Sequence, residues 1–252
     1  MSKLETVCMI PARLESTRFP RKLIQLIQGK PLIQYVYENA KRAKRLERVL
    51  VACDDETIKE CVEGFGGEAV LTGAHHKSGT ERIAEVARHL DCNFVVNLQG
   101  DEPLMHSDVV DQVVLALQRD ASCVMATACI PKSDPDEFVN PNVVKVTKDE
   151  NGWALYFSRS PIPHDRDGRT NRYFKHLGIY GYRRDFLLKF PRLAPSSLER
   201  VEKLEQLRAL ENGYRIKVVE TVHDSIGVDT EEDFKVVAER LGALAKVGVS
   251  HA

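Results

Sequence analysis

The chain lacks several features that would assign it to a special class of protein. Its formal net charge is only −1 over 252 residues, so no general attraction to nucleic acid or to an anionic membrane is expected. No apolar run approaches the length of a membrane-spanning helix, and the N-terminus has no long apolar segment of the signal-peptide kind. We therefore expect a cytoplasmic protein with no membrane segment and no nucleic-acid partner.

The six cysteines show none of the Cys-x-x-Cys spacing that is typical of zinc sites and redox motifs. Several of them fall in apolar runs, which indicates buried thiols in a reducing compartment. Two nucleotide-binding signatures are absent as well, because the chain has no GxxxxGK[ST] and no GxGxxG after its first predicted strand. The first loop is therefore neither a Walker A loop nor a dinucleotide fingerprint.

Short apolar runs alternate with amphipathic segments along most of the chain. The periodicity predicts strands at 7–10, 48–52, 68–71, 93–98, 123–129 and 216–220, and helices at 56–65, 80–90, 107–117, 198–211 and 230–246. Continuous apolar strands separated by helices are typical of an α/β fold, in which helices cover both faces of a mostly parallel sheet. We expect a single domain that spans residues 1–252.

The pattern changes between roughly residues 131 and 190. Predicted strands at 143–147, 153–157 and 176–182 are separated by a polar stretch, 161–172, that shows no periodicity. We interpret this region as a smaller antiparallel lobe with a mobile loop, inserted into the main domain.

The most informative segment is the loop that follows the first strand. Pro11 should end that strand, because proline cannot extend a central strand. The polar loop beyond it carries four basic residues, Arg13, Arg18, Arg21 and Lys22. Since α/β sheets bind ligands beyond the carboxyl ends of their strands, and since arginine and lysine pair with phosphate oxygens, the loop predicts a polyanion site. A solvated basic loop is the alternative.

Acidic residues follow two other predicted strands. Asp101 and Glu102 come after the strand at 93–98, where carboxylates could hold a hard cation such as Mg2+ together with phosphate oxygens and water. Asp229 lies at a second acidic strand end. A turn in Asp-Glu-Pro and a helix cap in Asp-Thr explain the same residues in another way. If the two carboxylates converge on one sheet edge, a cation should lie between them.

Other polar residues are candidates for binding. Ser78 and Gly79 precede the helix predicted at 80–90, with Thr80 placed to cap it, and the amides of such a helix start can bind base edges or phosphate. An ordinary N-cap accounts for them equally. In and after the lobe, a further group could bind a carboxylate or hydroxyls: Arg159, His176, Tyr180, Glu205 and Gln206. The last two equally fit the exposed surface of the helix predicted at 198–211.

Taken together, the motifs resemble those of one family, the CMP-Kdo synthetases, also called 3-deoxy-manno-octulosonate cytidylyltransferases. The resemblance covers nearly the whole chain and rests on IPARxxSTRxPxK, GKPLIQYVYENA, ACDDE, SGTER, VVNLQGDEPL, ALYFSRSPIP, HLGIYGYR, VEKLEQLRAL and GVDTEED. Each motif is weak alone, whereas their joint occurrence in this order is specific.

The resemblance implies transfer of CMP from CTP to 3-deoxy-manno-octulosonate (Kdo), an acidic eight-carbon sugar used in lipopolysaccharide synthesis, with release of pyrophosphate. It implies Mg2+ as the cofactor and a homodimer formed through the lobe. By position, the catalytic residues would be Lys22, Arg18 and Asp101. The nucleotide would contact Pro11, Ala12, Arg13, Arg18, Lys22, Ser78, Gly79, Arg82 and Gln99. The acceptor sugar would contact Arg159, His176, Tyr180, Glu205 and Gln206, and the metal would be bound by Asp101 and Asp229.

One departure from the family pattern concerns the basic loop. The family usually has Gly-Lys-Pro where this chain has Arg21-Lys22-Leu23, a run closer to the CMP-sialic acid synthetases, whose other motifs do not fit. The residues leave open 8-amino-Kdo or another ulosonic acid as the acceptor. A sugar nucleotidyltransferase that uses UTP or GTP shares the basic loop. A non-catalytic nucleotide-binding module is a third alternative, although such a module has no need of a metal-ready acidic pair.

Overall fold

The computed structural model describes residues 4–16, 18–168 and 172–249, with side chains to residue 244. Residues 169–171 of the polar stretch predicted to be mobile lie outside the described residues. Within the described parts of the chain, no helix is both long enough and apolar enough to cross a bilayer.

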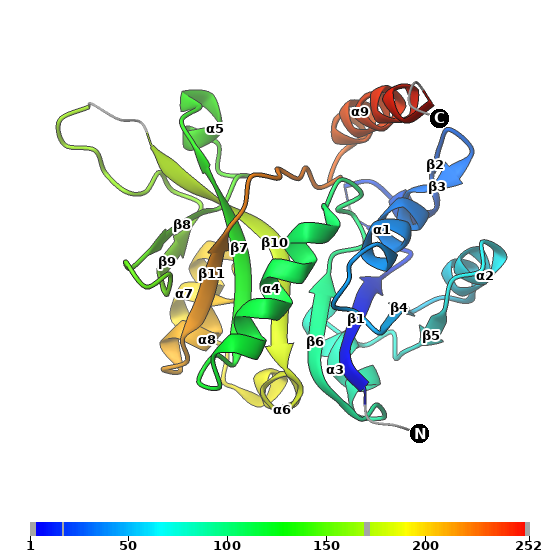
Figure 1. Cartoon of the computed structure of the whole chain (residues 1–252), viewed down its shortest axis with the longest axis horizontal. Coiled ribbons are helices and arrows are strands. Elements are labelled where there is room, and N and C mark those ends of the chain that lie inside the picture. Colours follow the sequence, from blue (N-terminus) through cyan, green and yellow to red (C-terminus); the bar gives the residue numbers. More distant parts are fainter. Residues whose placement is uncertain (1–3, 17, 169–171, 250–252) are drawn as a thin grey trace.

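A central sheet organises the molecule (Figure 1). Its strands are β1 (Leu4–Ala12), β4 (Arg48–Cys53), β5 (Ala69–Leu71), β6 (Cys92–Leu98), β7 (Met125–Lys132), β8 (Lys145–Lys148), β9 (Ala154–Ser158), β10 (Tyr173–Arg183) and β11 (Ile216–Glu220). Along the main path they follow the order β11-β7-β10-β6-β1-β4-β5. Strands β6, β1, β4 and β5 run parallel, as do β7 and β11, whereas β10 runs antiparallel between β6 and β7. The short strands β2 (Leu26–Ile27) and β3 (Lys30–Pro31) pair separately.

Helices cover both faces of the sheet, as the sequence predicts. They are α1 (Leu32–Lys41), α2 (Glu56–Gly64), α3 (Gly79–Ala87), α4 (Ser107–Arg119), α5 (Pro135–Val139), α6 (Arg184–Lys189), α7 (Ser197–Glu202), α8 (Leu207–Glu211) and α9 (Glu231–Val249), with 3₁₀ turns η1 (Lys22–Ile24) and η2 (Phe190–Arg192). Alternate residues of β1 enter two separate cores because successive side chains of a strand point to opposite faces. Cys8 and Ile10 pack with residues of α1, α2, α4 and α9, whereas Val7 and Met9 pack with residues of α3, α6 and α8.

The prediction that the first strand ends before Pro11 is wrong. β1 continues through Pro11 and Ala12, which pair with Ala52 and Cys53 of β4. On the other side, β6 pairs with β1 only as far as Met9. Proline is tolerated here because the ladder to β6 has already ended, so its missing N–H removes no bond to that strand.

The single helix predicted at 198–211 is also wrong, since the segment forms α7 and α8 with a break between them. Lys203 adopts φ = +55°, a left-handed conformation that ends α7. The carboxylate of Glu202 accepts hydrogen bonds from the Ser158 hydroxyl and the Arg159 N–H, which ties this end of α7 to β9. Glu205 and Gln206 consequently lie in the connection between the helices.

The region predicted as an inserted lobe contains the antiparallel strands β8, β9 and β10. β8 pairs with both β9 and β10, so these strands extend the main sheet (Figure 1). The division of the chain into a main domain and a lobe stays a prediction.

Candidate active site

A cavity of about 230 Å3 lies at the carboxyl ends of β1 and β6. Every predicted nucleotide-binding residue and both predicted metal ligands line it: Pro11, Ala12, Arg13, Arg18, Lys22, Ser78, Gly79, Arg82, Gln99, Asp101 and Asp229. The lining also includes residues that were not predicted, namely Ser16, Leu23, His76, Lys77 and Gly100. Segments far apart in sequence therefore meet at one edge of the sheet.

Asp101 follows β6 as predicted, but Asp229 lies in the connection from β11 to α9 and ends no strand, so that part of the prediction is wrong. Lys22 lies between these two residues, and only 9% of it is exposed. Its ammonium donates to Asp101 Oδ2 at 2.5 Å and to the Val228 carbonyl at 2.5 Å, and lies 3.4 Å from Asp229 Oδ1. The guanidinium of Arg18 contacts the other oxygen of Asp229 at 2.9 Å. The two carboxylates do converge, and Lys22 is the cation between them.

Asp229 is not the cap of the final helix, which was the alternative explanation for it. Thr230 Oγ1 accepts from the Asp233 N–H, and the Asp233 carboxylate accepts from the N–H groups of Asp229 and Thr230. The cap is therefore built by Thr230 and Asp233. This leaves the Asp229 carboxylate to face the cavity beside Asp101, where the pair offers the oxygen donors that Mg2+ prefers.

The start of α3 packs directly on the end of β1. A Cβ atom at Gly79 would lie 2.9 Å from Cγ of Pro11, so only glycine permits this close approach. The cap of α3 is Ser78, whose hydroxyl accepts from the Glu81 N–H, and not Thr80 as expected. The IPAR and SGTER motifs thus form one wall of the cavity.

Asp54 organises this wall, although it was not predicted as a site residue. Its carboxylate accepts from the Leu14 N–H at 3.0 Å and from the Arg82 guanidinium at 3.0 Å. Arg82 is 4% exposed and also donates to Thr72 Oγ1 at 2.6 Å. The signal that could have identified Asp54 is its position immediately after β4, at the sheet edge that also carries Asp101.

Glu102, which follows Asp101, does not line the cavity. Its carboxylate accepts a hydrogen bond from the Ser225 hydroxyl, and burial raises the pKa of Glu102 to about 7. The neighbouring Val228 N–H donates to the Asp101 carbonyl at 2.8 Å. These two contacts hold the segment that carries Asp229 against the loop that carries Asp101.

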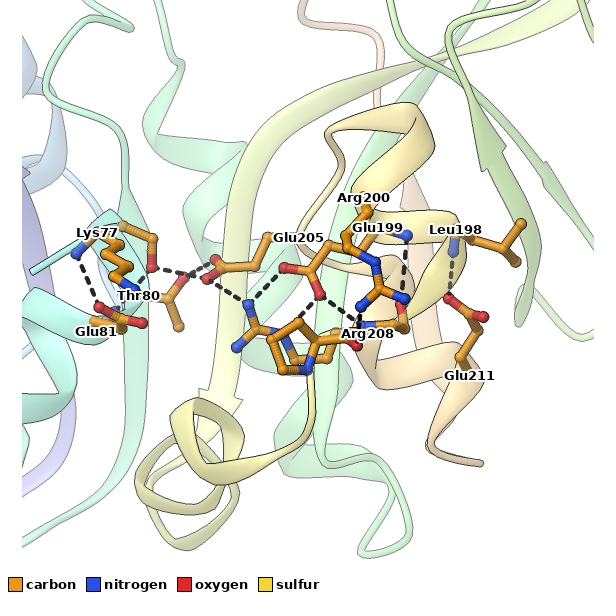
Figure 2. Close-up of polar contacts among 12 residues, drawn as sticks. Lys77, Thr80, Glu81, Leu198, Glu199, Arg200, Glu205, Arg208 and Glu211 are labelled. Atoms are coloured by element: carbon orange, nitrogen blue, oxygen red, sulfur yellow. Dashed lines mark hydrogen bonds and ion pairs between the residues drawn. The ribbon is translucent and has the colours of Figure 1, made fainter.

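Glu205 connects the predicted acceptor residues to the nucleotide cavity. Its two carboxylate oxygens accept from Ser78 Oγ at 2.7 Å and from Thr80 Oγ1 at 2.5 Å, and Figure 2 shows it between α3 and Arg208. Burial raises the pKa of Glu205. The adjacent Gln206 is 4% exposed, and its amide nitrogen has no hydrogen-bond partner among the described residues.

The other predicted acceptor residues lie around β9 and β10. The His176 ring meets Thr127 Oγ1 at 2.9 Å and packs edge-on against Phe157, with Tyr180 5.4 Å away. Burial lowers the pKa of His176 to about 3, so it would meet a ligand as a neutral imidazole. Arg159 donates to the backbone carbonyls of Glu202 and Pro141, each at 2.9 Å. None of the five predicted acceptor residues lines the 230 Å3 cavity itself.

The fold is a mixed sheet with helices on both faces, and its cavity brings a basic loop together with the carboxylates of Asp101 and Asp229. This combination is that of a nucleotidyltransferase, and the comparison with known families identifies which kind. Residues 7–218 match the family described as Cytidylyltransferase. Proteins named 3-deoxy-manno-octulosonate cytidylyltransferase from Geotalea daltonii and Syntrophobacter fumaroxidans are 49% and 51% identical to this chain. The alignments cover 94% and 93% of this chain, and 98% and 96% of those relatives. The chain belongs to the 3-deoxy-manno-octulosonate cytidylyltransferase family.

Solved structures agree with this assignment. A CMP:2-keto-3-deoxy-manno-octonic acid synthetase complexed with CTP superposes with a TM-score of 0.91 at 40% identity, covering 95% of this chain and 99% of that chain. A 4-diphosphocytidyl-2C-methyl-D-erythritol synthase from Anaerococcus prevotii superposes with a TM-score of 0.64 at 13% identity, covering 95% and 96% of the two chains. The second likeness shows the fold alone.

Proposed function

We propose that this enzyme transfers CMP from CTP to 3-deoxy-manno-octulosonate, or to a close analogue such as 8-amino-Kdo, for lipopolysaccharide synthesis. The observation that carries the proposal is the position of Lys22 in a strand-end cavity, bonded to Asp101 and facing Asp229. A buried ammonium beside two carboxylates is suited to a reaction in which phosphate charge must be neutralised. The proposal that the nucleotide is CTP and the acceptor is Kdo rests on membership of the family.

In the proposed reaction, Arg13, Arg18 and Lys22 bind the triphosphate. The anomeric hydroxyl of the acceptor attacks the α-phosphorus in line, and the bond from that phosphorus to the pyrophosphate oxygen breaks. Lys22 stabilises the charge that develops on the α-phosphate, and the basic loop retains the departing pyrophosphate. Ser78 and Gly79 border the same cavity and would contact the nucleoside.

Asp101 and Asp229 would hold Mg2+. The donor chemistry fits, because Mg2+ takes one or two carboxylates and completes its shell with phosphate oxygens and water. The side chains of Asp101 and Asp229 are 29% and 51% exposed, so both are accessible from the cavity. When bound, the ion would neutralise phosphate charge and orient the triphosphate. Lys22 and Arg18, which now contact these carboxylates, would then be available to the phosphate oxygens.

We also propose a cytoplasmic homodimer. Support for the location comes from the cysteines, none of which forms a disulfide and five of which are buried. Support for the dimer comes from an apolar groove of about 770 Å3 beside β8 and β9, where Leu155 is 62% exposed. Contiguous exposed apolar surface of this kind commonly marks an interface.

Pyrophosphate release with each nucleoside triphosphate, with and without Kdo and Mg2+, tests the proposed function. Release should require CTP, Kdo and the metal together, and UTP, GTP and ATP should give much less. Comparable turnover with UTP or GTP on a sugar phosphate would instead indicate a different sugar nucleotidyltransferase. Binding of CTP without release for any ulosonic acid would indicate a regulatory nucleotide-binding module.

A further inference from the structure

A row of charged side chains extends from the start of α3 to α7 (Figure 2). Glu205 contacts α3, and the guanidinium of Arg208 lies between Glu205 and Glu199 of α7. We propose that Arg208 is a positioning residue for the proposed reaction: it holds the Glu205 carboxylate where that group accepts hydrogen bonds from hydroxyls of the acceptor sugar. This inference rests on the proposed function, because it takes the acceptor to bind beside Glu205.

The guanidinium of Arg208 is held in one orientation. Its Nε and Nη2 donate to the two carboxylate oxygens of Glu199 at 2.9 Å and 2.5 Å, and such a bidentate pair fixes the guanidinium plane. It also lies over the ring of Phe190, 5.1 Å from the ring centroid. Glu199 is fixed in turn, since it forms the capping box of α7 with Ser196. Only 9% of the Arg208 side chain is exposed, so water and salt screen its charge little.

Arg208 faces Glu205 without donating a hydrogen bond to its carboxylate. Nη2 of Arg208 lies 3.9 Å from Glu205 Oε1. The two Glu205 oxygens accept instead from the hydroxyls of Ser78 and Thr80, at 2.7 Å and 2.5 Å. A carboxylate has about four acceptor positions, so these two bonds leave positions free for the hydroxyls of a sugar.

The charge of Arg208 matters because Glu205 is buried. Burial raises the pKa of Glu205, whereas hydrogen bonds from Thr80 and Ser78, and then the charge of Arg208, lower it. The carboxylate of Glu199 raises this pKa again. Without Arg208, two carboxylates would face each other and Glu205 would take up a proton more readily. A protonated carboxyl group offers fewer acceptor positions to a sugar.

The side chains that face Glu205 from the sheet are uncharged. They are Tyr180 and Tyr182 of β10, and burial raises the pKa of both phenols, so they stay neutral. On α3, the charge of Glu81 acts on Arg208 and favours its charged form. The positive charge that favours the ionised form of Glu205 therefore comes from Arg208.

The test is a double-mutant cycle on kcat/KM for Kdo, measured by pyrophosphate release at saturating CTP and Mg2+. Arg208→Gln removes the charge and keeps a side chain that can donate to Glu199. At pH 6 we expect kcat/KM for Kdo to fall by roughly tenfold, because a facing charge shifts a carboxyl pKa by about one pH unit or more. The loss should appear in KM for Kdo, with KM for CTP within about twofold of the parent value.

The second arm of the cycle uses Glu205→Gln as the background. There Arg208→Gln should cause little further loss, because the two residues act through one group. Losses that simply add would overturn the inference. Circular dichroism verifies that each variant is folded, and Arg208→Met, which fills the same buried space, replaces Arg208→Gln if the latter does not fold.

Glu199→Gln is the matched control. It breaks the same ion pair but leaves the guanidinium of Arg208 to face Glu205, so loosening of α7 and α8 affects both variants whereas loss of the cation affects only one. We expect kcat/KM for Kdo to stay within about threefold of the parent value in Glu199→Gln. Equal losses in Glu199→Gln and Arg208→Gln would show that Arg208 only braces the two helices, and would overturn the inference.

A measurement without catalysis separates this inference from the proposed function. The carbon-13 signal of the Glu205 carboxyl group, assigned by its loss in Glu205→Gln, is titrated by NMR. The pKa of Glu205 should lie above the parent value in Arg208→Gln and below it in Glu199→Gln. Absence of turnover with any ulosonic acid would remove the proposed function, and the titration would then decide whether Arg208 acts on Glu205. Equal titration curves in the three proteins would overturn the inference.

Discussion

Among single residues, Lys22 makes the contacts on which the charge balance of the cavity depends. It is 9% exposed and donates to both Asp101 and the Val228 carbonyl. We expect Lys22→Ala to lower turnover by roughly 100-fold or more, the scale associated with loss of one charge-stabilising donor. Steady-state pyrophosphate release with CTP and Kdo measures the effect. Turnover within a few-fold of the parent enzyme would show that Lys22 only pairs with the carboxylates.

The residue before Lys22, where the resemblance to the family predicts glycine, has a backbone conformation that suits glycine. Arg21 adopts φ = +58°, in the left-handed region that glycine enters without steric cost. For Arg21→Gly, relief of about 1 kcal/mol of strain should offset the greater freedom of glycine in the unfolded chain. We expect activity to be retained and the melting temperature to stay within about 2 °C of the parent value. A loss of activity larger than that of Lys22→Ala would show that the loop is aligned incorrectly with the family.

His176 should make stability depend on pH. Burial lowers the pKa of His176 from 6.5 to about 3, so between these values the unfolded chain binds a proton that the folded chain does not. The contribution is fully present above pH 6.5 and is lost as the pH falls, by up to about 1.4 kcal/mol per pH unit. Glu102, whose pKa is raised from 4.5 to about 7, has the opposite effect: its contribution to stability increases as the pH falls between these values.

The comparison with His176→Gln isolates this histidine, because Glu102 is common to both proteins. The free energy of unfolding, measured with denaturant at pH 7, 6 and 5, should fall more steeply in the parent than in the variant. Parallel pH dependences would mean that His176 binds its proton over the same pH range in the folded and the unfolded chain, which contradicts the lowered pKa.

At the scale of elements, the connection from β11 to α9 delivers Asp229 to the cavity while Thr230 and Asp233 cap the helix. Asp229→Asn should therefore leave the cap intact and change the melting temperature little, since a half-exposed ion pair contributes at most about 1 kcal/mol. If Asp229 binds Mg2+, turnover should fall severely and the Mg2+ concentration for half-maximal rate should rise. Near-normal rates across the Mg2+ titration would remove Asp229 from the site.

Hydrophobic periodicity predicted most elements of the fold to within a few residues. The strand predicted at 216–220 coincides with β11, and the helix predicted at 107–117 with most of α4. Both follow from local patterns, because buried strands and amphipathic helices depend on neighbouring residues. The break at Lys203 depends instead on contacts of Glu202 with Ser158 and Arg159 of a distant strand. Contacts between residues this far apart in the sequence cannot be predicted from local helix propensity.

The residues of the cavity could also be predicted in part, where a local sequence pattern indicated their position. Asp101 was found because it follows β6, at the edge of the sheet where the carboxyl ends of parallel strands lie. Lys22 and Asp229 reach the same edge from connecting segments, so the prediction that a strand ends at Asp229 is wrong. The contacts of Asp54 with the Leu14 N–H and of Glu102 with the Ser225 hydroxyl were not predicted, because each joins residues that are far apart in the sequence. The sequence therefore predicted which side chains contribute to the cavity, but not how those side chains are oriented, because tertiary packing determines their orientation.

For the whole molecule, the nucleotide cavity and the apolar groove lie beside different strands of the sheet. The nucleotide cavity lies at the carboxyl ends of β1 and β6, while the apolar groove lies beside β8 and β9. Figure 1 shows that β8 and β9 lie apart from β1. The groove is lined in part by Leu155, which is 62% exposed, and by Phe174, and this apolar area is left in water in a single chain. Burying it against a second copy would remove that area from water at about 25 cal/mol per Å2.

We therefore expect the protein to be a dimer in solution and Leu155→Glu to be a monomer, because the substitution replaces exposed apolar area with a charged group whose removal from water is costly. Leu244→Glu is the matched control: Leu244 is also 62% exposed, but it lies on α9 at the far end of the molecule from β9 (Figure 1). Light scattering after size-exclusion chromatography gives the mass of each protein, and circular dichroism verifies that both variants are folded. If Leu155→Glu remains a dimer while Leu244→Glu dissociates, the interface lies on α9 and not on the antiparallel strands. If both variants and the parent are monomers, the groove beside β8 and β9 serves some purpose other than self-association.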